Sequence, residues 1–533
     1  MNKLYIIITL LLSGMLSACD STLEESPEYT LNGKSVFAEE QSAQLALNAC
    51  YGYLAGHSMY GQNVIAVEEV ASGLAWSRKG SDALSHFASL RYMPDDNYNR
   101  LFWKGAYKTI GECNAFIADA SKSSLERKEY MIGQAKFIRG LAYYNLVFVY
   151  GDVPLRIGAS TADNIHMSRT PKAKVLEQVI SDFVDATQSL KDTEADTSVP
   201  SKVSAYAMLA KVYFLMGSAE GAGSKNWVKA KQYGDEVFKL AGNDLPLEPV
   251  FEDLFSENTT ESVESIFKLN YSMAGVSLSY NKNSWMYSPY GSTKGGIHYP
   301  NRRVSKSFFK YFTVKHPGDP RLDVSFFHSF YTRYKKIAGV WKATTQKCYP
   351  TINRVGNQMS WAFYKKHFDS RQSGQTAAKT FFVYRFADFL LLMADVENEL
   401  GNTTKAVEYV NKVLKRARES VVPAALEPAD LDASITQDVL RQFIFDERLF
   451  ELVEEGHSFI ETRRRGYEFF RPIIDRHNSD PDAAPGFDST SPWSDHRLPE
   501  SKAEIEKAFL MPIPQSEIST NNEISVDDQN QGY

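Results

Sequence analysis

The stretch GQAKFIRGLAYYNLVFVYGDVPL, residues 133–155, decides the fold of this chain. Its apolar residues recur at steps of three and four, which places them on one face of a helix: Ala135, Ile138, Ala142, Leu146 and Val149. Gly151 and Pro154 end that helix, because proline cannot continue the hydrogen-bond ladder. Gly140 lets a second helix come close, while tyrosine and phenylalanine make the other sides apolar as well. We therefore predict a helix buried between helical neighbours.

Further helices are predicted on both sides of this stretch. The same apolar spacing occurs at 41–54, 101–117, 171–190, 204–217, 227–240, 384–401 and 405–418. Many of these segments are rich in Ala, Gly and Tyr and look like the helical hairpins of tetratricopeptide-type proteins, which stack on one another. We predict a mostly α chain with an N-terminal helical part at 36–247, a C-terminal helical part at 381–475, and loops and a tail at 476–533.

The first residues predict export. An apolar run of signal-peptide length at 4–16 is too short for a membrane span, and the small residues of LSAC at 16–19 follow it. This ending resembles the lipobox of bacterial lipoproteins, whose cysteine becomes the lipidated first residue. The alternative is an ordinary secretory signal with an incidental cysteine. The resemblance implies a signal peptide at 1–18, lipidation at Cys19 and a lipidated tether at 19–35.

Composition argues against several classes of function. The 533 residues carry a formal net charge of −6 and no basic stripe, so nucleic acid is not an expected partner. With Cys19 assigned to lipid, only Cys50, Cys113 and Cys348 remain, and no Cys-x-x-Cys pair is present. A disulfide framework and a zinc site are therefore not expected, whereas one bridge or free buried thiols both stay open. We predict no cofactor and no metal, and leave a structural calcium ion open.

The helical signal fades at 248–380. This part is rich in Gly, Ser, Asn, Tyr and Trp, which predicts long loops and short strands. So long an irregular segment inside a folded protein is functional or disordered, and its aromatic content argues against disorder. We predict that it is a loop-rich region that binds the ligand.

Four stretches together resemble the SusD/RagB family of nutrient-binding outer-membrane lipoproteins of Bacteroidetes. They are the helix at 133–155, RFADFLLLMADVENELG at 385–401, ER..EL..EG at 447–456, and MPIP..EI with a QNQGY ending at 511–533. In this order, they cover nearly the whole mature chain. The chain departs from the family pattern at Ser458, Glu461, Glu523 and Gln531, where the family commonly has Arg, Asp, Pro and Pro. These departures weaken individual contacts and do not threaten the fold.

The resemblance implies a SusD-like fold and a role in nutrient uptake. Such proteins capture oligosaccharide at the cell surface and pass it to a SusC-like TonB-dependent transporter, on which they sit as a lid. Asp20, Glu24 and Glu25 look like the signal that sends lipoproteins to the cell surface. We therefore expect a non-catalytic glycan-binding lipoprotein, anchored by lipid in the outer membrane and facing the extracellular side. Its expected partners are a SusC-like transporter and an oligosaccharide.

Aromatic residues on loops are the candidate ligand contacts. A pyranose ring packs its C–H face on flat Trp and Tyr side chains, while its hydroxyl groups need polar neighbours. We predict a platform of Trp76, Trp285, Tyr287, Tyr290 and Trp341, with Arg78 as its polar neighbour. For any one of these aromatic residues, ordinary burial explains the sequence equally well.

The charged clusters are predicted to be structural. The acidic residues at 446–455 are spaced by three and four on one helix, which favours salt bridges over the paired carboxylates of a glycosidase. Asp388 and Asp395 are expected to pair with Arg385 or with backbone donors. No short catalytic motif occurs in a suitable structural context, so we predict that the protein is not an enzyme. The alternatives are a surface glycoside hydrolase on a helical scaffold and a peptide-binding uptake lipoprotein of the same fold.

Overall fold

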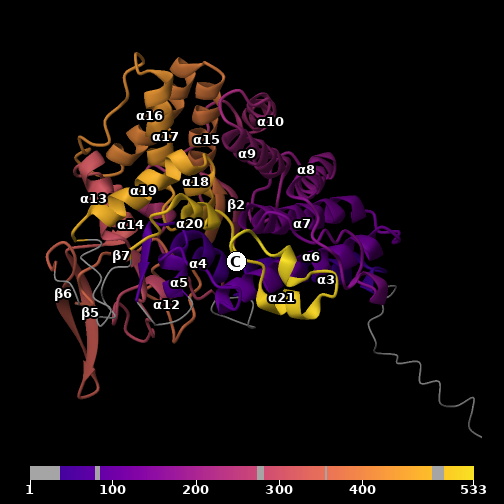
Figure 1. Cartoon of the computed structure of the whole chain (residues 1–533), viewed down its shortest axis with the longest axis horizontal. Coiled ribbons are helices and arrows are strands. Elements are labelled where there is room, and N and C mark those ends of the chain that lie inside the picture. The colour runs from indigo at the N-terminus through magenta and orange to yellow at the C-terminus, as the bar shows by residue number, and fades with distance from the viewer. Residues whose placement is uncertain (1–35, 79–83, 273–280, 354–356, 483–496) are drawn as a thin grey trace, which may run out of the picture.

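The computed structural model describes residues 36–78, 84–272, 281–353, 357–482 and 497–533. The predicted signal peptide, Cys19 and the tether lie outside these residues. The described part is mostly α, as predicted, and its strands pair in four antiparallel two-stranded sheets. Figure 1 shows α6 to α10 (residues 97–241) on one side of the molecule and α15 to α19 (residues 386–479) on the other.

From α6 onward, each long N-terminal helix packs against the helix that follows it in the sequence. The N-terminal elements are α3 (Glu40–Ala55), α4 (Asn63–Val70), α5 (Leu84–Ala88), α6 (Asn97–Ala120), α7 (Lys128–Tyr150), the 3-10 turn η1 (Ala162–Asn164), α8 (Lys172–Ser189), α9 (Lys202–Glu220) and α10 (Asn226–Ala241). Helix α7 contacts both α6 and α8, and α9 contacts both α8 and α10. This arrangement confirms the predicted helical hairpins, which bury one another's apolar faces.

Helix α7 is buried between its neighbours because its small residues let them approach. A Cβ atom added at Gly140 would lie 3.1 Å from the Phe183 ring of α8, and one at Gly133 would overlap the Ser189 hydroxyl. The helix ends at Gly151, whose φ of +75° is a conformation that glycine adopts without strain. The predicted end of the helix is therefore confirmed.

The loop-rich part at 248–380 contains more helix than the sequence predicts. Its elements are α11 (Phe251–Leu254), β2 (Ser265–Leu269), α12 (Asn283–Tyr287), β3 (Arg302–Val304), α13 (Lys306–Lys315), α14 (Arg321–Ser325), β4 (Phe326–Phe327), β5 (Phe330–Ile337), β6 (Val340–Lys347) and β7 (Phe363–Tyr364). Helix α13 was not predicted, although Ser305 caps it by accepting a hydrogen bond from the Phe308 amide at 3.2 Å. Its buried Phe308, Phe309 and Phe312 do have helical spacing, but the helix spans only Lys306–Lys315 within a part of the sequence dominated by loop residues.

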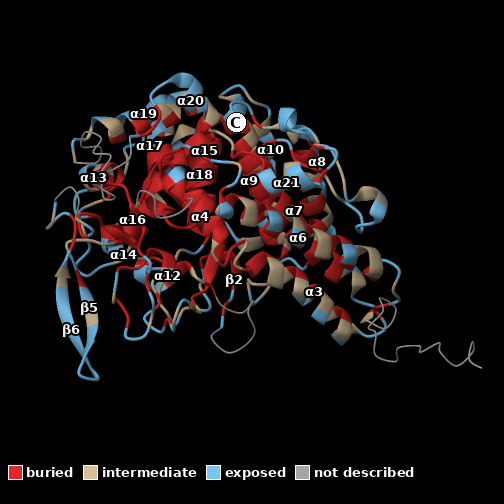
Figure 2. Ribbon diagram, turned by 60° about the horizontal axis from the view of Figure 1, so that its bottom comes forward, coloured by how far each residue is buried: buried red, intermediate tan, exposed pale blue. Residues whose placement is uncertain are grey.

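The C-terminal part returns to long helices. It contains β8 (Phe381–Arg385), α15 (Phe386–Glu399), α16 (Thr403–Glu419), α17 (Gln437–Glu451), α18 (Ser458–Arg463), α19 (Tyr467–Ser479), α20 (Lys502–Lys507), α21 (Gln515–Thr520) and the 3-10 turn η2 (Val526–Asp528). Every residue of α15 is buried. Together with α4 and α18 it forms part of the red core in Figure 2, whereas the β5–β6 hairpin is mostly blue.

Charged residues on these helices pair inside the protein, as predicted for the 446–455 cluster. Glu447 and Glu451 both accept from Arg321, at 2.5 and 2.8 Å. The expected partner of Asp388 was wrong: its carboxylate pairs with Lys211 at 2.7 Å and Arg448 at 2.6 Å. These cations come from distant helices, which spacing within one helix cannot reveal.

The C-terminal tail packs on the end of α7. Asn530 donates from its side-chain amide to the backbone carbonyls of Tyr150 at 2.9 Å and Met511 at 2.7 Å. The Met511 amide donates to the Val149 carbonyl at 2.9 Å. Two of the stretches that carry the family resemblance therefore meet in space.

The three cysteines of the described residues, Cys50, Cys113 and Cys348, are buried and form no disulfide.

Candidate functional site

Short strands and loop hydrogen bonds bring three of the predicted site residues, Trp76, Arg78 and Trp285, close to one another. Strand β1 (Ala75–Ser77) pairs with β3, so that Trp76 lies opposite Arg303. Past the end of β1, the Arg78 amide donates to the Asn301 carbonyl at 3.0 Å. The Tyr299 amide in turn donates to the Trp285 carbonyl at 2.9 Å. The segments around Trp76, Trp285 and Tyr299, which are distant in sequence, are thus joined by backbone hydrogen bonds.

Two of the predicted platform residues are packed inside the protein. Trp76 is 1% exposed and stacks on Trp361 with ring centroids 4.2 Å apart, while Arg303 lies 5.2 Å from the Trp76 centroid. Tyr287 is fully buried and meets Tyr364 edge-on at 5.5 Å, and burial holds the pKa of the Tyr287 hydroxyl well above its usual value. Neither ring offers a face to a ligand in this structure. This corrects their predicted role, because loop composition does not show which aromatic residues face inward.

Trp285 forms an open aromatic pair. It is half-buried on α12 and stacks with Tyr299, with ring centroids 6.1 Å apart and planes inclined by 20°. Tyr299 is 37% exposed and was not among the predicted contacts. Its only sequence signal is its place in the aromatic loop, since no short-range pattern predicts that it returns to Trp285. The exposed parts of the two rings offer aromatic surface on which the apolar face of a sugar can pack.

Tyr290 connects this pair to the β5–β6 hairpin. Its own ring is exposed, and its backbone carbonyl accepts a hydrogen bond from the Tyr331 hydroxyl at 3.1 Å. The next carbonyl, that of Gly291, accepts from the Tyr334 amide at 2.7 Å. Gly291 has a φ of +70°, and a Cβ atom there would lie 2.9 Å from the Tyr334 carbonyl oxygen. Only glycine therefore allows the loop to follow strand β5 this closely.

Trp341 lies on β6, directly opposite Lys336 on β5. The Trp341 side chain is 40% exposed, and the Lys336 ammonium lies 5.8 Å from the ring centroid. Tyr334, on the same face of the hairpin, lies 5.4 Å from the ammonium of Lys294. The sequence prediction included Trp341 but missed Tyr334 and both lysines. The pairing register brings them together, and the sequence does not state that register.

A buried histidine stabilises the loop that carries these residues. His298 lies 2.9 Å from the Thr293 hydroxyl, and burial lowers the pKa of its imidazole to about 4. The ring is therefore neutral at neutral pH. A Cβ atom at Gly296 would lie 3.0 Å from the His298 ring, so this loop is tightly packed.

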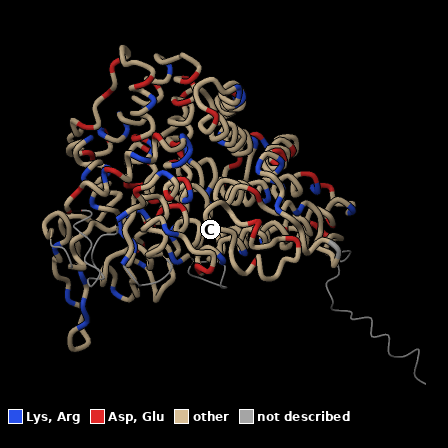
Figure 3. The backbone as a smooth tube through the Cα atoms, in the orientation of Figure 1, with Lys and Arg blue, Asp and Glu red and all other residues tan. Residues whose placement is uncertain are grey.

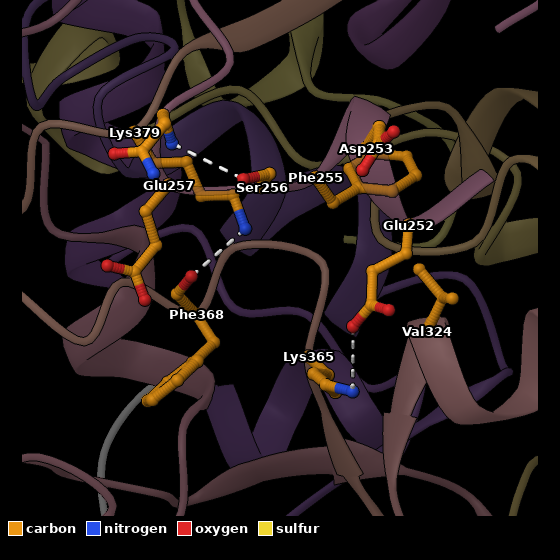
Figure 4. A pocket seen from close by; sticks show the side chains of 10 residues that line it. Glu252, Asp253, Phe255, Ser256, Glu257, Val324, Lys365, Phe368 and Lys379 are labelled. Carbon is orange, nitrogen blue, oxygen red and sulfur yellow. Dashed lines mark hydrogen bonds and ion pairs between the residues drawn. The ribbon is translucent and has the colours of Figure 1, made fainter. Parts of the chain in front are cut away.

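A separate cavity of about 480 Å³ lies between the α11 segment and the loop after β7. Figure 4 shows Glu252 beside Lys365 on one side and Glu257 on the other. The Lys365 ammonium is 3.9 Å from Glu252, and the Lys379 ammonium donates to the Phe368 carbonyl at 2.9 Å. Burial lowers the pKa of Lys379 to about 8. The lining of this cavity carries more charged side chains than the surface formed by Trp285 and Tyr299. The sequence analysis did not predict the cavity.

Three features are absent from the part of the chain that the structure describes. In it, the ring contacts, hydrogen bonds and ion pairs of Trp285, Tyr290, Tyr299 and Trp341 involve no carboxylate. The same ranges contain no group of three or more His, Cys, Asp or Glu side chains arranged to hold a metal ion. None of the helices within them is long and apolar enough to cross a membrane.

Comparison with known proteins assigns the chain to a family. Residues 259–533 match the sequence profile of the SusD family, and residues 23–214 match a profile described as starch-binding and associating with the outer membrane. SusD-like protein P2 of Formosa agariphila is 28% identical over 543 residues, which covers 100% of both chains. SusD-like protein P38 of the same organism is 24% identical, over 86% of this chain and 91% of its own.

Solved structures share the fold. A SusD homologue from Bacteroides thetaiotaomicron superposes with a TM-score of 0.75 at 17% identity, covering 94% of this chain and 98% of its own. A laminarin-binding SusD-like protein superposes with a TM-score of 0.68 at 20% identity, covering 93% of this chain and 100% of its own. With a profile match over more than half of its length and this fold, the chain belongs to the SusD family.

Proposed function

We propose that this protein is a non-catalytic glycan-binding protein of the outer membrane, which captures oligosaccharide and delivers it to a SusC-like transporter. The observation that carries the proposal is the partly exposed Trp285–Tyr299 pair, continued by Tyr290 and Trp341. Stacked and exposed aromatic rings suit the apolar faces of successive sugar units. Membership of the SusD family and the laminarin-binding relative support the same class of ligand.

The binding step can be tested by titration calorimetry against a panel of oligosaccharides and peptides, with product analysis of each mixture. Trp285→Ala and Tyr299→Ala should each weaken glycan binding by about tenfold or more, because each removes one ring of the stack. Tyr206→Ala is a matched control, since Tyr206 and Tyr233 form a similar partly buried stack at 6.3 Å on α9 and α10.

Three outcomes would contradict parts of this proposal. Turnover of any panel member would show catalysis and favour the hydrolase. Binding of peptides alone would replace the ligand class and keep the fold. Equal losses in the Tyr206→Ala control would show that the effect is general destabilisation and that the Trp285 pair is not the contact.

The anchor and the partner form the second half of the proposal. We expect lipid on Cys19 to hold the protein at the outer membrane, with residues 19–35 as a tether to the folded body. Cys19→Ala should abolish labelling by radioactive palmitate and move the protein out of the outer-membrane fraction. Protease treatment of intact cells tests the extracellular orientation, and cross-linking with mass spectrometry should identify a TonB-dependent barrel. Retention of Cys19→Ala in the membrane with unchanged labelling would refute lipidation at this residue.

A further inference from the structure

The β5–β6 hairpin concentrates positive charge on a chain that is acidic overall. The hairpin has no Asp or Glu, and its basic residues are Arg333, Lys335, Lys336, Lys342 and Lys347. The whole chain has a formal net charge of −6. Within the described ranges none of these cations forms an ion pair. Figure 3 shows blue without red along this projecting element.

One face of the hairpin alternates aromatic rings with ammonium groups. The register places Lys336 opposite Trp341 and Phe330 opposite Lys347, and Tyr334 lies on the same face between them. Phe330 is 49% exposed and Trp341 is 40% exposed. We call Phe330, Tyr334, Trp341, Lys336 and Lys347 the aromatic face.

Each ring on the aromatic face has a lysine beside it. The ammonium of Lys336 is 5.8 Å from the Trp341 centroid, and that of Lys294 is 5.4 Å from the Tyr334 centroid. Lys347 faces Phe330 across the strand pair. The ammonium groups of Lys336 and Lys294 lie over one side of their rings. A sugar with an acidic substituent matches this pairing of ring and cation: its C–H face packs on aromatic surface, and its anion pairs with the neighbouring ammonium.

The other face of the hairpin carries three cations that repel one another. Lys335 lies directly across from Lys342, and like charges in this position destabilise a strand pair. Arg333 lies on the same face and contributes a third cation. An anion bound beside these cations would relieve the repulsion, so the charge on this face also favours an acidic ligand over a neutral one.

Building on the proposed function above, we propose that this protein selects acidic glycans, whose carboxylate or sulfate groups bind the lysines of the β5–β6 hairpin while their sugar rings stack on its aromatic face. Tyr334 of the aromatic face donates from its amide to the Gly291 carbonyl at 2.7 Å, so this face adjoins the loop that carries Tyr290 and leads back to Trp285. The local cations would also attract an acidic ligand toward this end of a negatively charged molecule.

An anionic membrane surface is the competing partner for a basic hairpin with an apolar tip. The tip residues Ile337 and Val340 are exposed, at 45% and 62%. Three of the five hairpin cations lie within two residues of this tip pair, whereas Arg333 and Lys347 continue the positive charge toward the base of the hairpin. Charges that follow the rings along the strands favour an extended acidic chain over an interface that touches the tip alone.

The test compares matched ligands that differ only in charge. The full chain is titrated with oligogalacturonate and its methyl ester, and with a sulfated galactan oligosaccharide and its desulfated form. At least one charged member should bind about tenfold more tightly than its neutral partner, and this difference should shrink as salt is raised. The carboxylate and sulfate arms show which acidic group is selected.

The charge variant is Lys336→Gln with Lys347→Gln. It should lose the preference for the charged member, by about tenfold, and keep binding to the neutral member. Lys174→Gln with Lys405→Gln is the control with the same change in net charge, since these lysines are 63% and 50% exposed on α8 and α16. The control should keep the preference.

Each other outcome is decisive. Equal binding of the charged and neutral members, or an equal loss of preference in the control, would overturn acidic selection and leave glycan binding in place. Binding of no member would overturn this inference, while the wider oligosaccharide and peptide panel decides the proposed function separately. Sedimentation of the protein with phosphatidylglycerol vesicles, lost in the hairpin variant while charge selection among glycans is absent, would assign the hairpin to the membrane surface.

Discussion

At the scale of single residues, buried carboxyl groups make stability depend on pH. Glu68 accepts from the Ile460 amide at 3.2 Å, and Glu454 accepts from the Lys366 amide at 2.8 Å. Burial raises the pKa of both carboxyl groups to about 8, from an ordinary value of 4.5. Between these values the folded protein holds protons that the unfolded chain releases. The free energy of unfolding therefore falls as pH rises from about 4.5 to about 8.

Glu68→Gln tests this dependence. The amide keeps the shape of the side chain and cannot titrate, so the fall in unfolding free energy with pH should become shallower by up to about 1.4 kcal/mol per pH unit. Urea unfolding between about pH 5 and pH 8 measures this slope. Glu177→Gln, at an exposed position on α8, should leave the slope unchanged. Parallel curves for Glu68→Gln and the parent would refute the raised pKa.

At the scale of elements, close helix packing depends on glycine at particular positions. Gly140 on α7 faces Phe183 and Asp182 of α8, and a Cβ atom there would lie 3.1 and 3.3 Å from their side chains. Gly111 on α6 is also helical, but a Cβ atom there would meet nothing within 4 Å. The two positions separate the intrinsic effect of glycine in a helix from the effect of packing.

Gly140→Leu should lower the free energy of unfolding by about 1–3 kcal/mol, because the added side chain forces α7 and α8 apart. Gly111→Leu should raise it by up to about 1 kcal/mol, since leucine has the higher helix propensity and open space around it. Chemical denaturation of both variants measures the difference. A stabilising Gly140→Leu would show that α8 does not lie as close to α7 as described.

At the scale of the whole molecule, a buried ion network joins parts of the chain that are far apart in sequence. Arg385, at the end of β8, pairs with Glu455 at 2.6 Å, Glu264 at 2.6 Å and Glu451 at 2.7 Å. Glu451 also pairs with Arg321 of α14 at 2.8 Å. The network therefore connects the loop-rich part, which carries the hairpin, to the C-terminal helices.

Arg385→Met should destabilise the protein by about 3–5 kcal/mol, because it leaves buried carboxylates without their shared cation. Arg418→Met, at a more exposed ion pair with Asp430 at 2.7 Å, should cost about 1 kcal/mol or less. Thermal and urea unfolding compare the two. A similar small loss in both variants would show that the network does not hold the two parts together.

Acid should weaken the same network. Burial alone would raise the pKa of Glu451, but Arg416, Arg385 and Arg321 outweigh burial and hold this pKa well below 4.5. The stabilising contribution of Glu451 is therefore complete above the unfolded value and is lost as pH falls toward the folded pKa. This loss lies on the acidic side, opposite to the effect of Glu68.

Local sequence determined the helical fold because its signals need only a few neighbouring residues. Apolar spacing, small residues and the Gly151 stop are enough to predict α7, and the family resemblance follows from stretches of this kind. The candidate site depends on contacts across the chain. Trp285 gains its partner Tyr299 through a folded loop, and Trp341 gains Lys336 through strand register.

The class of fold, its helical hairpins and the abundance of aromatic residues in the loop-rich part can all be predicted from local sequence. Which aromatic rings remain exposed depends on tertiary packing. Trp76 has the same side chain as the exposed Trp341, and Tyr287 the same as the exposed Tyr290, yet packing against Trp361 and Tyr364 buries them. The physical reason is that helix periodicity is a local property of the backbone, whereas exposure is set by whichever distant segment covers a side chain.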